Sequence, residues 1–428
     1  MIKYDCPICD SDEWEYIDHL RSQEYWFVRE IREEGEPVGF KICKTCGYVS
    51  YDYIDEKRLA AIYDLQRPVM VANNIITCNR KNTYHAQFLD GVKIEGRVLD
   101  VGCAQGAFLN WCHEARGITK DQLVGTEYSK AFANFGRHYY GLNIVDEATG
   151  KFDFISYYHV LEHVQYPGRE LEKIKGMLAP GGLVYISVPT WFDICYETSG
   201  IILSDFENYF HLNHVNVFSI TSFNNLLAKH GFIPLKVDTE LYGYTVLCRV
   251  DNSSYGPIKE DYHDIIKIIE TQKAAIACLD QSVNKAAEAV KLYPKFPDAY
   301  IYWALDRDNM KKFEAQETIL KQGLSILPNN ERIRGQLARL YFQWDENTPE
   351  KKGFYSNNVK RAEKLLRELY TEKPGNEEHL FMLAMIEHKY KGNSGAAIDM
   401  LRECMNANPM RLNECIGNIG VICKEYHG

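Results

Sequence analysis

The run Val98-Leu99-Asp100-Val101-Gly102-Cys103-Ala104-Gln105-Gly106-Ala107-Phe108-Leu109 decides the fold of this chain. It begins as a short apolar stretch, breaks at glycine and other small residues, and continues as an amphipathic stretch over Ala107–Ala115, so it predicts a strand, a tight turn and a helix. Gly102 and Gly106 let the backbone approach a ligand, and the helix N-terminus behind them presents N–H groups to polar atoms. The pattern therefore indicates a turn that cradles a cofactor.

Three further segments follow in order along the chain. The first predicts a strand that ends in a carboxylate, the second a strand followed by a short polar stretch, and the third a turn that leads into another strand. They are Leu123–Glu127, Phe152–Val164 and Leu178–Val188. Glu127 lies 27 positions after Asp100, a spacing at which an acidic side chain holds both hydroxyls of a ribose.

Together these segments resemble the class I S-adenosylmethionine-dependent methyltransferases. Members of that family carry a glycine turn, an acid after the second strand, a Phe-Asp strand followed by Leu-Glu-His-Val, and a Leu-x-Pro-Gly-Gly turn, and all four parts occur here between about Ala60 and Val250. The sequence departs from the family at Ala104, where many members have a third glycine. The resemblance implies a Rossmann-like α/β fold that binds S-adenosylmethionine. It implies that the following residues contact the cofactor or face the acceptor: Asp100, Gly102, Cys103, Gly106, Glu127, Tyr157 and Tyr158.

Length and charge limit the remaining possibilities. A chain of 428 residues predicts two or three domains. The formal net charge of −10, from 49 Lys and Arg against 59 Asp and Glu, argues against sequence-independent binding to nucleic acid or to an anionic membrane. With no apolar signal segment and no apolar run of spanning length, we expect a cytoplasmic protein whose thirteen cysteines are reduced or bound to metal.

Two Cys-x-x-Cys motifs stand near the beginning of the chain. They are Cys6-Pro7-Ile8-Cys9 and Cys43-Lys44-Thr45-Cys46. Four thiolates at this doubled spacing predict a closed tetrahedral site that holds structural zinc, in preference to unliganded thiols or a redox pair. We predict a zinc ribbon-like domain over residues 1–54 and hypothesise that it forms part of the substrate pocket.

Residues 55–95 predict mainly helices. In the class I family the equivalent helices lie over the cofactor, and Tyr63, Tyr84 and His85 could line such a lid. Packing of these aromatic side chains between helix and sheet is an equally good interpretation.

Two histidines are candidates for the chemical step. Methyl transfer is an in-line displacement that depends on alignment, and a hydroxyl acceptor benefits from removal of its proton. His163 follows the strand Phe152–Tyr158, and His214 lies in a loop before the predicted helix Thr221–His230. His163 therefore lies near the carboxyl end of the sheet, where open α/β folds bind ligands.

The two histidines also resemble those of a subgroup of bacterial sugar methyltransferases that carry an N-terminal cysteine-bound zinc region. That subgroup has a histidine at the position of His163 and a Tyr-His-Glu-His segment whose last histidine matches His214. The resemblance implies that His214, or else His163, is the general base. Asn213 replaces the glutamate and His211 the tyrosine, which argues against carbon methylation and favours oxygen methylation.

Alternatives remain open at these positions. His163 could only fix a helix, as the same motif does elsewhere in the family. His211 and His214 could bind a divalent metal with Glu162 and His163, a pattern related to that of a metal-dependent RNA 2′-O-methyltransferase family. The acidic charge and His159, which stands where that family has another glutamate, argue against membership of that RNA methyltransferase family.

The composition changes after the linker Asp251–Pro257, and helical periodicity dominates from Tyr262 onward. Prolines recur at intervals of 34, 46 and 35 residues, at Pro294, Pro328, Pro374 and Pro409. The period resembles that of tetratricopeptide helical hairpins, with about twelve extra residues placed at Trp344–Ser356. Such an array offers a surface for a protein partner or for self-association.

We therefore predict a zinc ribbon over residues 1–54, a class I methyltransferase domain over 55–255 and an all-α repeat domain over 256–428. The predicted reaction is O-methylation of a sugar or other small hydroxylated metabolite in glycan or natural-product biosynthesis. One rival is a protein methyltransferase that recruits its substrate through the repeats. The other is a non-catalytic scaffold, against which the intact glycine turn and Glu127 argue.

Overall fold

The computed structural model describes most of the chain. The described residues are 5–17, 39–51, 82, 84–190, 214–238, 243–251, 258–281, 285–306, 312–346, 355–372, 376–407 and 412–427. They divide into two compact units, the first made of the described N-terminal residues together with Tyr84–Glu270, and the second chiefly of the residues from Thr271 onward. The predicted division into three domains, with its boundary after residue 255, stays a prediction.

Within the described part of the first unit, the central element is a seven-stranded sheet. Its strand order is β10 (Phe232–Asp238), β11 (Tyr244–Val250), β8 (Leu178–Val188), β7 (Phe152–Tyr158), β4 (Val98–Val101), β5 (Leu123–Thr126) and β6 (Asn143–Val145). The five strands from β8 to β6 are parallel, and β11 and β10 add to their edge in antiparallel fashion. This is the Rossmann-like α/β arrangement that the sequence predicts.

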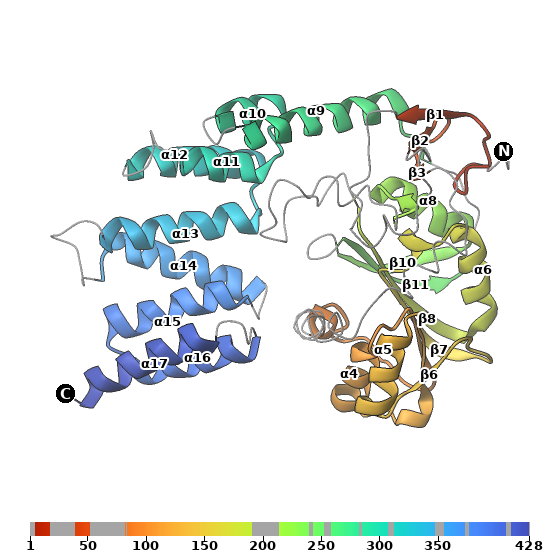
Figure 1. The fold of residues 1–428 in the computed structure, drawn as a ribbon, viewed down its shortest axis with the longest axis horizontal. Helices are drawn as coiled ribbons and strands as arrows, with labels where there is room; N and C mark the ends of the chain where they lie inside the picture. Colours follow the sequence, from red (N-terminus) through yellow and green to blue (C-terminus); the bar gives the residue numbers. More distant parts are fainter. Residues whose placement is uncertain are drawn as a thin grey trace. The chain divides into compact units, whose positions relative to one another are not determined.

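Helices cover both faces of the sheet (Figure 1). Residues of α4 (Ala107–Arg116) and α5 (Lys130–Phe135) share one buried cluster with alternate residues of the central strands. Residues of α6 (Pro167–Met177) and α8 (Ile220–Lys229) share the cluster on the opposite face. Because side chains of a strand alternate between faces, the apolar runs of β4, β7 and β8 supply both clusters.

Local signals explain where several of these helices begin and end. The helix predicted over Ala107–Ala115 extends to Arg116 and ends at Gly117, which has φ 71°. Such a left-handed glycine is a common helix stop. The helix predicted over Thr221–His230 begins instead at Ile220, after Ser219, whose hydroxyl accepts the N–H of Ser222.

The prediction of a turn at Leu178–Gly182 is wrong. Strand β8 already begins at Leu178, which pairs with Phe152, and the register shifts before the next pair, Phe154 with Leu183. Gly181 has φ 78° within this stretch. The Pro-Gly-Gly residues therefore form an irregularity inside the strand ladder, because the backbone on either side keeps its pairing with β7.

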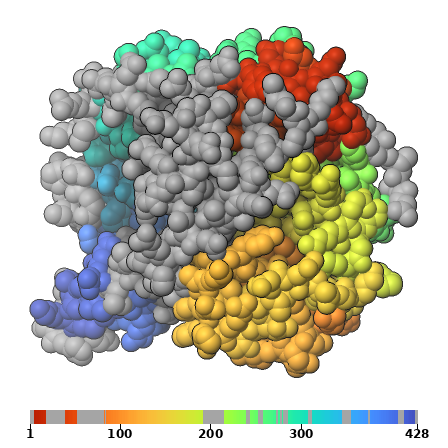
Figure 2. Space-filling model, turned by 45° about the vertical axis from the view of Figure 1, so that its right-hand side comes forward, coloured from red at the N-terminus to blue at the C-terminus, as the bar shows by residue number. Residues whose placement is uncertain are grey.

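A second, smaller sheet joins the N-terminal residues to the same unit. Its order is β1 (Trp14–Ile17), β2 (Phe40–Cys43), β3 (Val49–Tyr51) and β9 (Asn216–Val217), and all neighbours are antiparallel. Cys6, Cys46 and Tyr48 belong to the buried cluster that also contains residues of α6 and α8. In Figure 2 the red surface of residues 5–17 and 39–51 lies beside yellow and green surfaces of the same unit. These N-terminal residues therefore pack on the central part of the chain.

The second unit is helical throughout its described residues. Its helices are α10 (Ala286–Leu292), α11 (Pro297–Ala304), α12 (Phe313–Ile326), α13 (Glu331–Glu346), α14 (Asn357–Glu372), α15 (Glu377–Lys391), α16 (Ser394–Ala407) and α17 (Leu412–His427), preceded by α9 (Tyr262–Gln281), which crosses the boundary between the units. Pairs such as α13 with α14 and α15 with α16 match the predicted hairpins, whereas membership of the tetratricopeptide family stays a prediction. Most of the extra residues placed at Trp344–Ser356 lie outside the described ranges.

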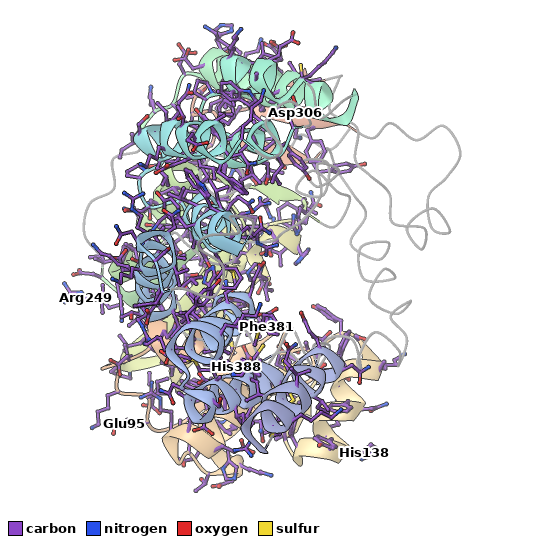
Figure 3. The ribbon with its side chains drawn as sticks, turned by 90° about the vertical axis from the view of Figure 1, so that its left-hand side faces the viewer. Glu95, His138, Arg249, Asp306, Phe381 and His388 are labelled. Carbon is purple, nitrogen blue, oxygen red and sulfur yellow. The ribbon has the colours of Figure 1, made fainter. Side chains whose placement is uncertain are left out.

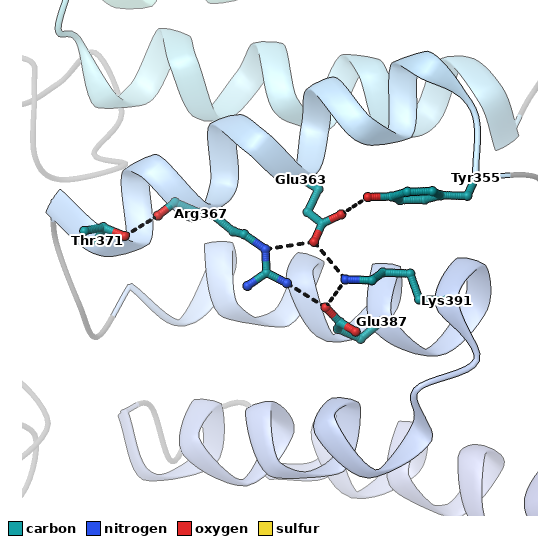
Figure 4. Close-up of polar contacts among 6 residues, drawn as sticks. All are labelled: Tyr355, Glu363, Arg367, Thr371, Glu387 and Lys391. Carbon is teal, nitrogen blue, oxygen red and sulfur yellow. Dashed lines mark hydrogen bonds and ion pairs between the residues drawn. The ribbon is translucent and has the colours of Figure 1, made fainter.

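Charged side chains connect neighbouring helices of this unit. Arg367 on α14 donates to Glu363 on its own helix and to Glu387 on α15, at 2.8 and 2.6 Å (Figure 4). Lys391 donates to the same two carboxylates at 3.1 and 2.7 Å. Both carboxylates are nearly buried, so the two cations hold α14 and α15 in register. Elsewhere on α15, His388, labelled in Figure 3, shares a hydrogen bond with Ser394.

Within the described ranges, every helix is too short or too polar to cross a bilayer.

Candidate active site

The order of the sheet marks where a ligand binds. Strand β4 lies between β5 and β7. The chain runs from β4 through β5 to β6 at one edge of the sheet and then returns to β7 on the other side of β4, so the strand order reverses between β4 and β7. In open α/β sheets, ligands bind outside the carboxyl ends of the strands at such a switch point. The segments that follow β4, β5 and β7 therefore define the candidate site.

The turn after β4 has the left-handed backbone that its glycines favour. Gly102 and Gly106 have φ of 65° and 78°, and Ala104 between them has φ 47°. A side chain in that region costs about 1 kcal/mol, which explains why related turns use glycine there. The Ala104 N–H donates to Glu127 Oε2 at 2.9 Å, which helps to hold this conformation.

Neighbouring side chains leave no room for larger residues in this turn. A Cβ on Gly102 would lie 2.6 Å from Val160, which follows β7, and one on Gly106 would lie 2.5 Å from Leu142. Cys103 is buried against Gly125 of β5, and its burial raises the pKa of its thiol. Of the predicted contacts in this turn, Cys103 thus has its side chain in the core, its N–H donates to the Thr126 carbonyl at 2.9 Å, and its carbonyl accepts the Gly106 N–H at 2.8 Å.

Glu127 connects the ends of β4 and β5. Its second oxygen, Oε1, accepts the N–H of Ser129 at 2.7 Å. Burial raises the pKa of Glu127, although the N–H groups of Ser129 and Ala104 oppose that shift. Asp100, at the end of β4, is also buried. Two carboxylates, those of Asp100 and Glu127, therefore flank the turn.

The two tyrosines at the end of β7 point to opposite faces. Tyr157 is buried in the cluster with α6 and α8, and its hydroxyl donates to Glu170 at 2.8 Å. Tyr158 lies against His85 on the other face, with ring centroids 4.7 Å apart. His85 shares a 2.8 Å hydrogen bond with the Tyr185 hydroxyl. The structure therefore does not bring the side chains of Tyr157 and Tyr158 together.

The structure does bring together His163 and His214, the two predicted bases. Their ring centroids are 4.9 Å apart, although 51 positions separate them in the sequence. Glu162, which is fully buried, lies beside them, with its Oε1 3.6 Å from His163 Nε2. The same oxygen lies 3.5 Å from His159 Nδ1, and His159 has φ 58°. His211 lies outside the described residues.

Comparison with known proteins fixes the nature of this part of the chain. A family model described as a methyltransferase domain matches residues 79–237, which contain the glycine turn, Glu127 and His163. Residues 79–237 form a class I S-adenosylmethionine-dependent methyltransferase domain.

Relatives of this methyltransferase domain are distant. The mitochondrial ubiquinone biosynthesis O-methyltransferase of Saccharomyces cerevisiae is 30% identical over 124 residues, covering 25% of this chain and 40% of the yeast protein. The match therefore spans less than half of that relative. An S-adenosylmethionine-dependent methyltransferase from Mesorhizobium loti is 15% identical over 39% of this chain and 97% of its own, with a TM-score of 0.33. One from Archaeoglobus fulgidus is 16% identical over 42% and 98%, with a TM-score of 0.32.

Asn216 explains why the methyltransferase domain holds His163 and His214 side by side. It lies two positions after His214, and its buried amide donates to the carbonyls of Leu161 and Val164 at 2.8 and 2.7 Å. These carbonyls flank His163, so one side chain fixes the turn Leu161–His163 against strand β9.

The N-terminal residues hold Asn216 in turn. The Tyr48 hydroxyl donates to Asn216 Oδ1, and Ser50 of β3 pairs with Asn216 in the ladder. The Ser50 hydroxyl and the Tyr51 N–H also donate to the Val215 carbonyl, at 3.1 and 2.8 Å. Sequence reasoning missed Tyr48 and Asn216 as supports of the methyltransferase site, because nothing local in the sequence shows that they meet.

The four predicted metal-binding cysteines lie together next to Tyr48. Their sulfurs are all within 4.8 Å of one another, with 3.6 Å between Cys6 and Cys46 and between Cys9 and Cys43. None forms a disulfide. Thiolates about 2.3 Å from a common tetrahedral ion lie about 3.8 Å apart, so this set fits zinc.

Proposed function

We propose that this protein transfers the methyl group of S-adenosylmethionine to a hydroxyl group of a small hydroxylated metabolite, and that a sugar is the preferred acceptor. The observation that carries the proposal is the position of the His163–His214 pair. Val160 contacts the glycine turn at Gly102 and stands three positions before His163, so the pair lies next to the cofactor turn. A cofactor and an acceptor held at this edge of the sheet would lie side by side.

The residues around the glycine turn fit S-adenosylmethionine. A carboxylate that already accepts two backbone N–H groups, Glu127, retains lone pairs for the ribose hydroxyls. Val160 leaves no room for a side chain at position 102, so Gly102 can present only its backbone to a ligand. Asp100 offers a second carboxylate for a positively charged group. The cofactor would supply an electrophilic methyl group on a sulfonium.

The histidines would act on the acceptor. A neutral imidazole, first that of His214 and second that of His163, would accept the proton of the hydroxyl as its oxygen takes the methyl group. S-adenosylhomocysteine then leaves as the neutral thioether, and the imidazolium returns its proton to solvent. Glu162 would stabilise the charge that develops on the imidazoles.

Oxygen is the acceptor atom that the comparisons favour. The yeast relative is named an O-methyltransferase, and this chain lacks the glutamate and tyrosine of the carbon-methylating segment, having Asn213 and His211 instead.

We also propose that Cys6, Cys9, Cys43 and Cys46 hold a structural zinc ion, and that the helical unit binds a protein partner or a second copy of the chain. Metal analysis of the purified protein should show that Cys43→Ser contains about one zinc per chain less than the wild type. A zinc content that is unchanged in this variant would contradict the assignment.

The proposed reaction can be tested with radiolabelled S-adenosylmethionine and a panel of nucleotide sugars, phenols and peptides. Label should enter the hydroxylated small molecules, and His214→Asn and His163→Asn should each reduce the rate by about 100-fold or more, in the range of general acid–base catalysis. His230→Asn is the control, because His230 pairs with Glu172 on α6, outside the His163–His214 pair. Label that enters only peptides, or rates that both variants retain, would contradict the proposal.

A further inference from the structure

The side chains of Glu162, His163 and His214 form a group with the composition of a metal site. One ligand atom from each of the three lies within 4.8 Å of the others. We propose that these three residues bind a divalent first-row transition-metal ion, which then activates the acceptor hydroxyl. The ion-binding part of the proposal stands by itself, and the activating role rests on the proposed function.

The distances within the group suit ligands of a shared ion. Two ligand atoms about 2.1 Å from one ion lie about 3.0 Å apart at right angles and about 3.4 Å apart at the tetrahedral angle. Glu162 Oε1 lies 3.6 Å from His163 Nε2, beyond the 3.2 Å limit of an ordinary hydrogen bond. A histidine–glutamate pair elsewhere in the unit, His230 with Glu172, lies at 2.7 Å, which is a direct hydrogen bond.

Burial adds an electrostatic argument. The Glu162 side chain is 0% exposed, whereas that of His163 is 21% exposed. A carboxylate removed from water loses its hydration, and a divalent ion bound to it would offset that loss. The imidazole of His163 would bind the ion from the more exposed side, which leaves coordination positions open toward solvent. Open positions distinguish catalytic metal sites from closed structural sites.

His159 lies beside the group, next to its carboxylate. Its Nδ1 lies 3.5 Å from the same Glu162 oxygen. Its φ of 58° is uncommon for a residue other than glycine, and such backbone conformations gather at functional sites. With two imidazoles and one carboxylate, the set suits Mn²⁺, Fe²⁺, Co²⁺ or Zn²⁺ better than Mg²⁺ or Ca²⁺, which take oxygen ligands.

The open positions indicate a class of acceptor. Two neighbouring oxygens, as in the vicinal diol of a sugar, would occupy two adjacent positions on the ion. A bound hydroxyl has a lowered pKa, so it would release its proton to solvent and its oxygen would then take the methyl group from the sulfonium. With the ion in place, His163 and His214 are ligands, and the ion replaces an imidazole as the group that activates the hydroxyl.

The test uses the full chain with its cysteine site loaded with zinc. Mn²⁺ and Co²⁺ serve as probes, the first followed by the loss of the free-ion electron paramagnetic resonance signal and the second by its visible absorption. We expect one ion per chain, with affinity at least about 30-fold weaker in Glu162→Gln and in His214→Asn. His230→Asn is the matched control and should bind as the wild type does. Circular dichroism verifies that each variant is folded.

Two results would overturn the proposal. One is that neither probe binds the wild-type chain below about 1 mM, and the other is that folded His214→Asn and Glu162→Gln bind both probes as the wild type does. The outcome is separate from that of the proposed function. Binding of the ion without any methyl transfer would leave the metal site and remove the function, whereas methyl transfer that persists without ion binding would do the reverse.

Discussion

Replacement of Asn216 by alanine should release the turn that carries His163. The Asn216 side chain is 1% exposed and makes three hydrogen bonds, one from the Tyr48 hydroxyl and two to the carbonyls of Leu161 and Val164. Each is worth roughly 0.5–1.5 kcal/mol, and the substitution removes one hydrogen bond from each of the three partners, of which Tyr48 and Leu161 are buried. We therefore expect a local loss of about 3 kcal/mol, or roughly 100-fold in the equilibrium between closed and open states.

Hydrogen exchange followed by mass spectrometry measures this loss where it occurs. Peptides that cover residues 161–164 and strand β9 should exchange about 100-fold faster in Asn216→Ala, and methyl transfer should fall by more than tenfold. Peptides from α14 and α15 should exchange as in the wild type.

Asn225→Ala is the matched control. Asn225 is also buried, and it both donates to and accepts from the Ile258 backbone, at 2.7 and 3.0 Å. Its replacement should destabilise α8 and the start of α9 by about 2 kcal/mol while the His163 peptide keeps its protection. If both variants lowered methyl transfer equally, or if Asn216→Ala left residues 161–164 protected, the reasoning about this support would be refuted.

Three further predictions follow from the same contacts. Ala104→Gly should stabilise the first unit by about 1 kcal/mol without weakening cofactor binding, because Ala104 has φ 47°; a lower melting temperature would contradict this. Burial raises the pKa of Glu127, so acidification from pH 7 should protonate this carboxylate, and weaken the binding of S-adenosylmethionine, at a pH above the ordinary glutamate pKa; titration calorimetry across pH measures this. The effect on folding has the opposite sign. A raised pKa stabilises the folded state fully below the pKa of the unfolded chain, and this stabilisation is lost as the pH rises through the pKa of the folded state. Arg367→Ala should destabilise the α14–α15 pair by roughly 1–2 kcal/mol, because the half-exposed guanidinium bridges two nearly buried carboxylates. Arg402 forms an exposed ion pair, so Arg402→Ala should change the stability of the helical unit by less than about 0.5 kcal/mol. Equal hydrogen-exchange rates of α14 peptides in the two variants would contradict this prediction.

Local patterns in the sequence were sufficient for the central fold. The strand β4, the helix α4 and the carboxylate Glu127 follow from apolar periodicity, glycine placement and spacing, and all of these are short-range signals. The predicted turn at Leu178–Gly182 is wrong for a long-range reason, because β8 pairs with β7 on both sides of the Pro-Gly-Gly residues, at Leu178 and again from Leu183. Propensity alone does not show such pairing.

The candidate site was predictable only in part. His163 and His214 were identified from motifs, yet their contact depends on Asn216 and on Tyr48, which is 168 positions away from Asn216 in the sequence. Tyr157 illustrates the reverse, because its position at the end of β7 suggested a ligand contact whereas strand alternation places it in the core against Glu170.

The binding of S-adenosylmethionine tests the central claim most directly. Isothermal titration of the full chain with S-adenosylmethionine and S-adenosylhomocysteine should give micromolar affinity. Glu127→Gln should weaken it by about 100-fold, since two hydrogen bonds to a charged carboxylate are worth roughly 3 kcal/mol, and the exposed Glu172→Gln should not. Absence of binding to the wild type, or equal affinity in Glu127→Gln, would contradict the assignment of the glycine turn and Glu127 as the cofactor site.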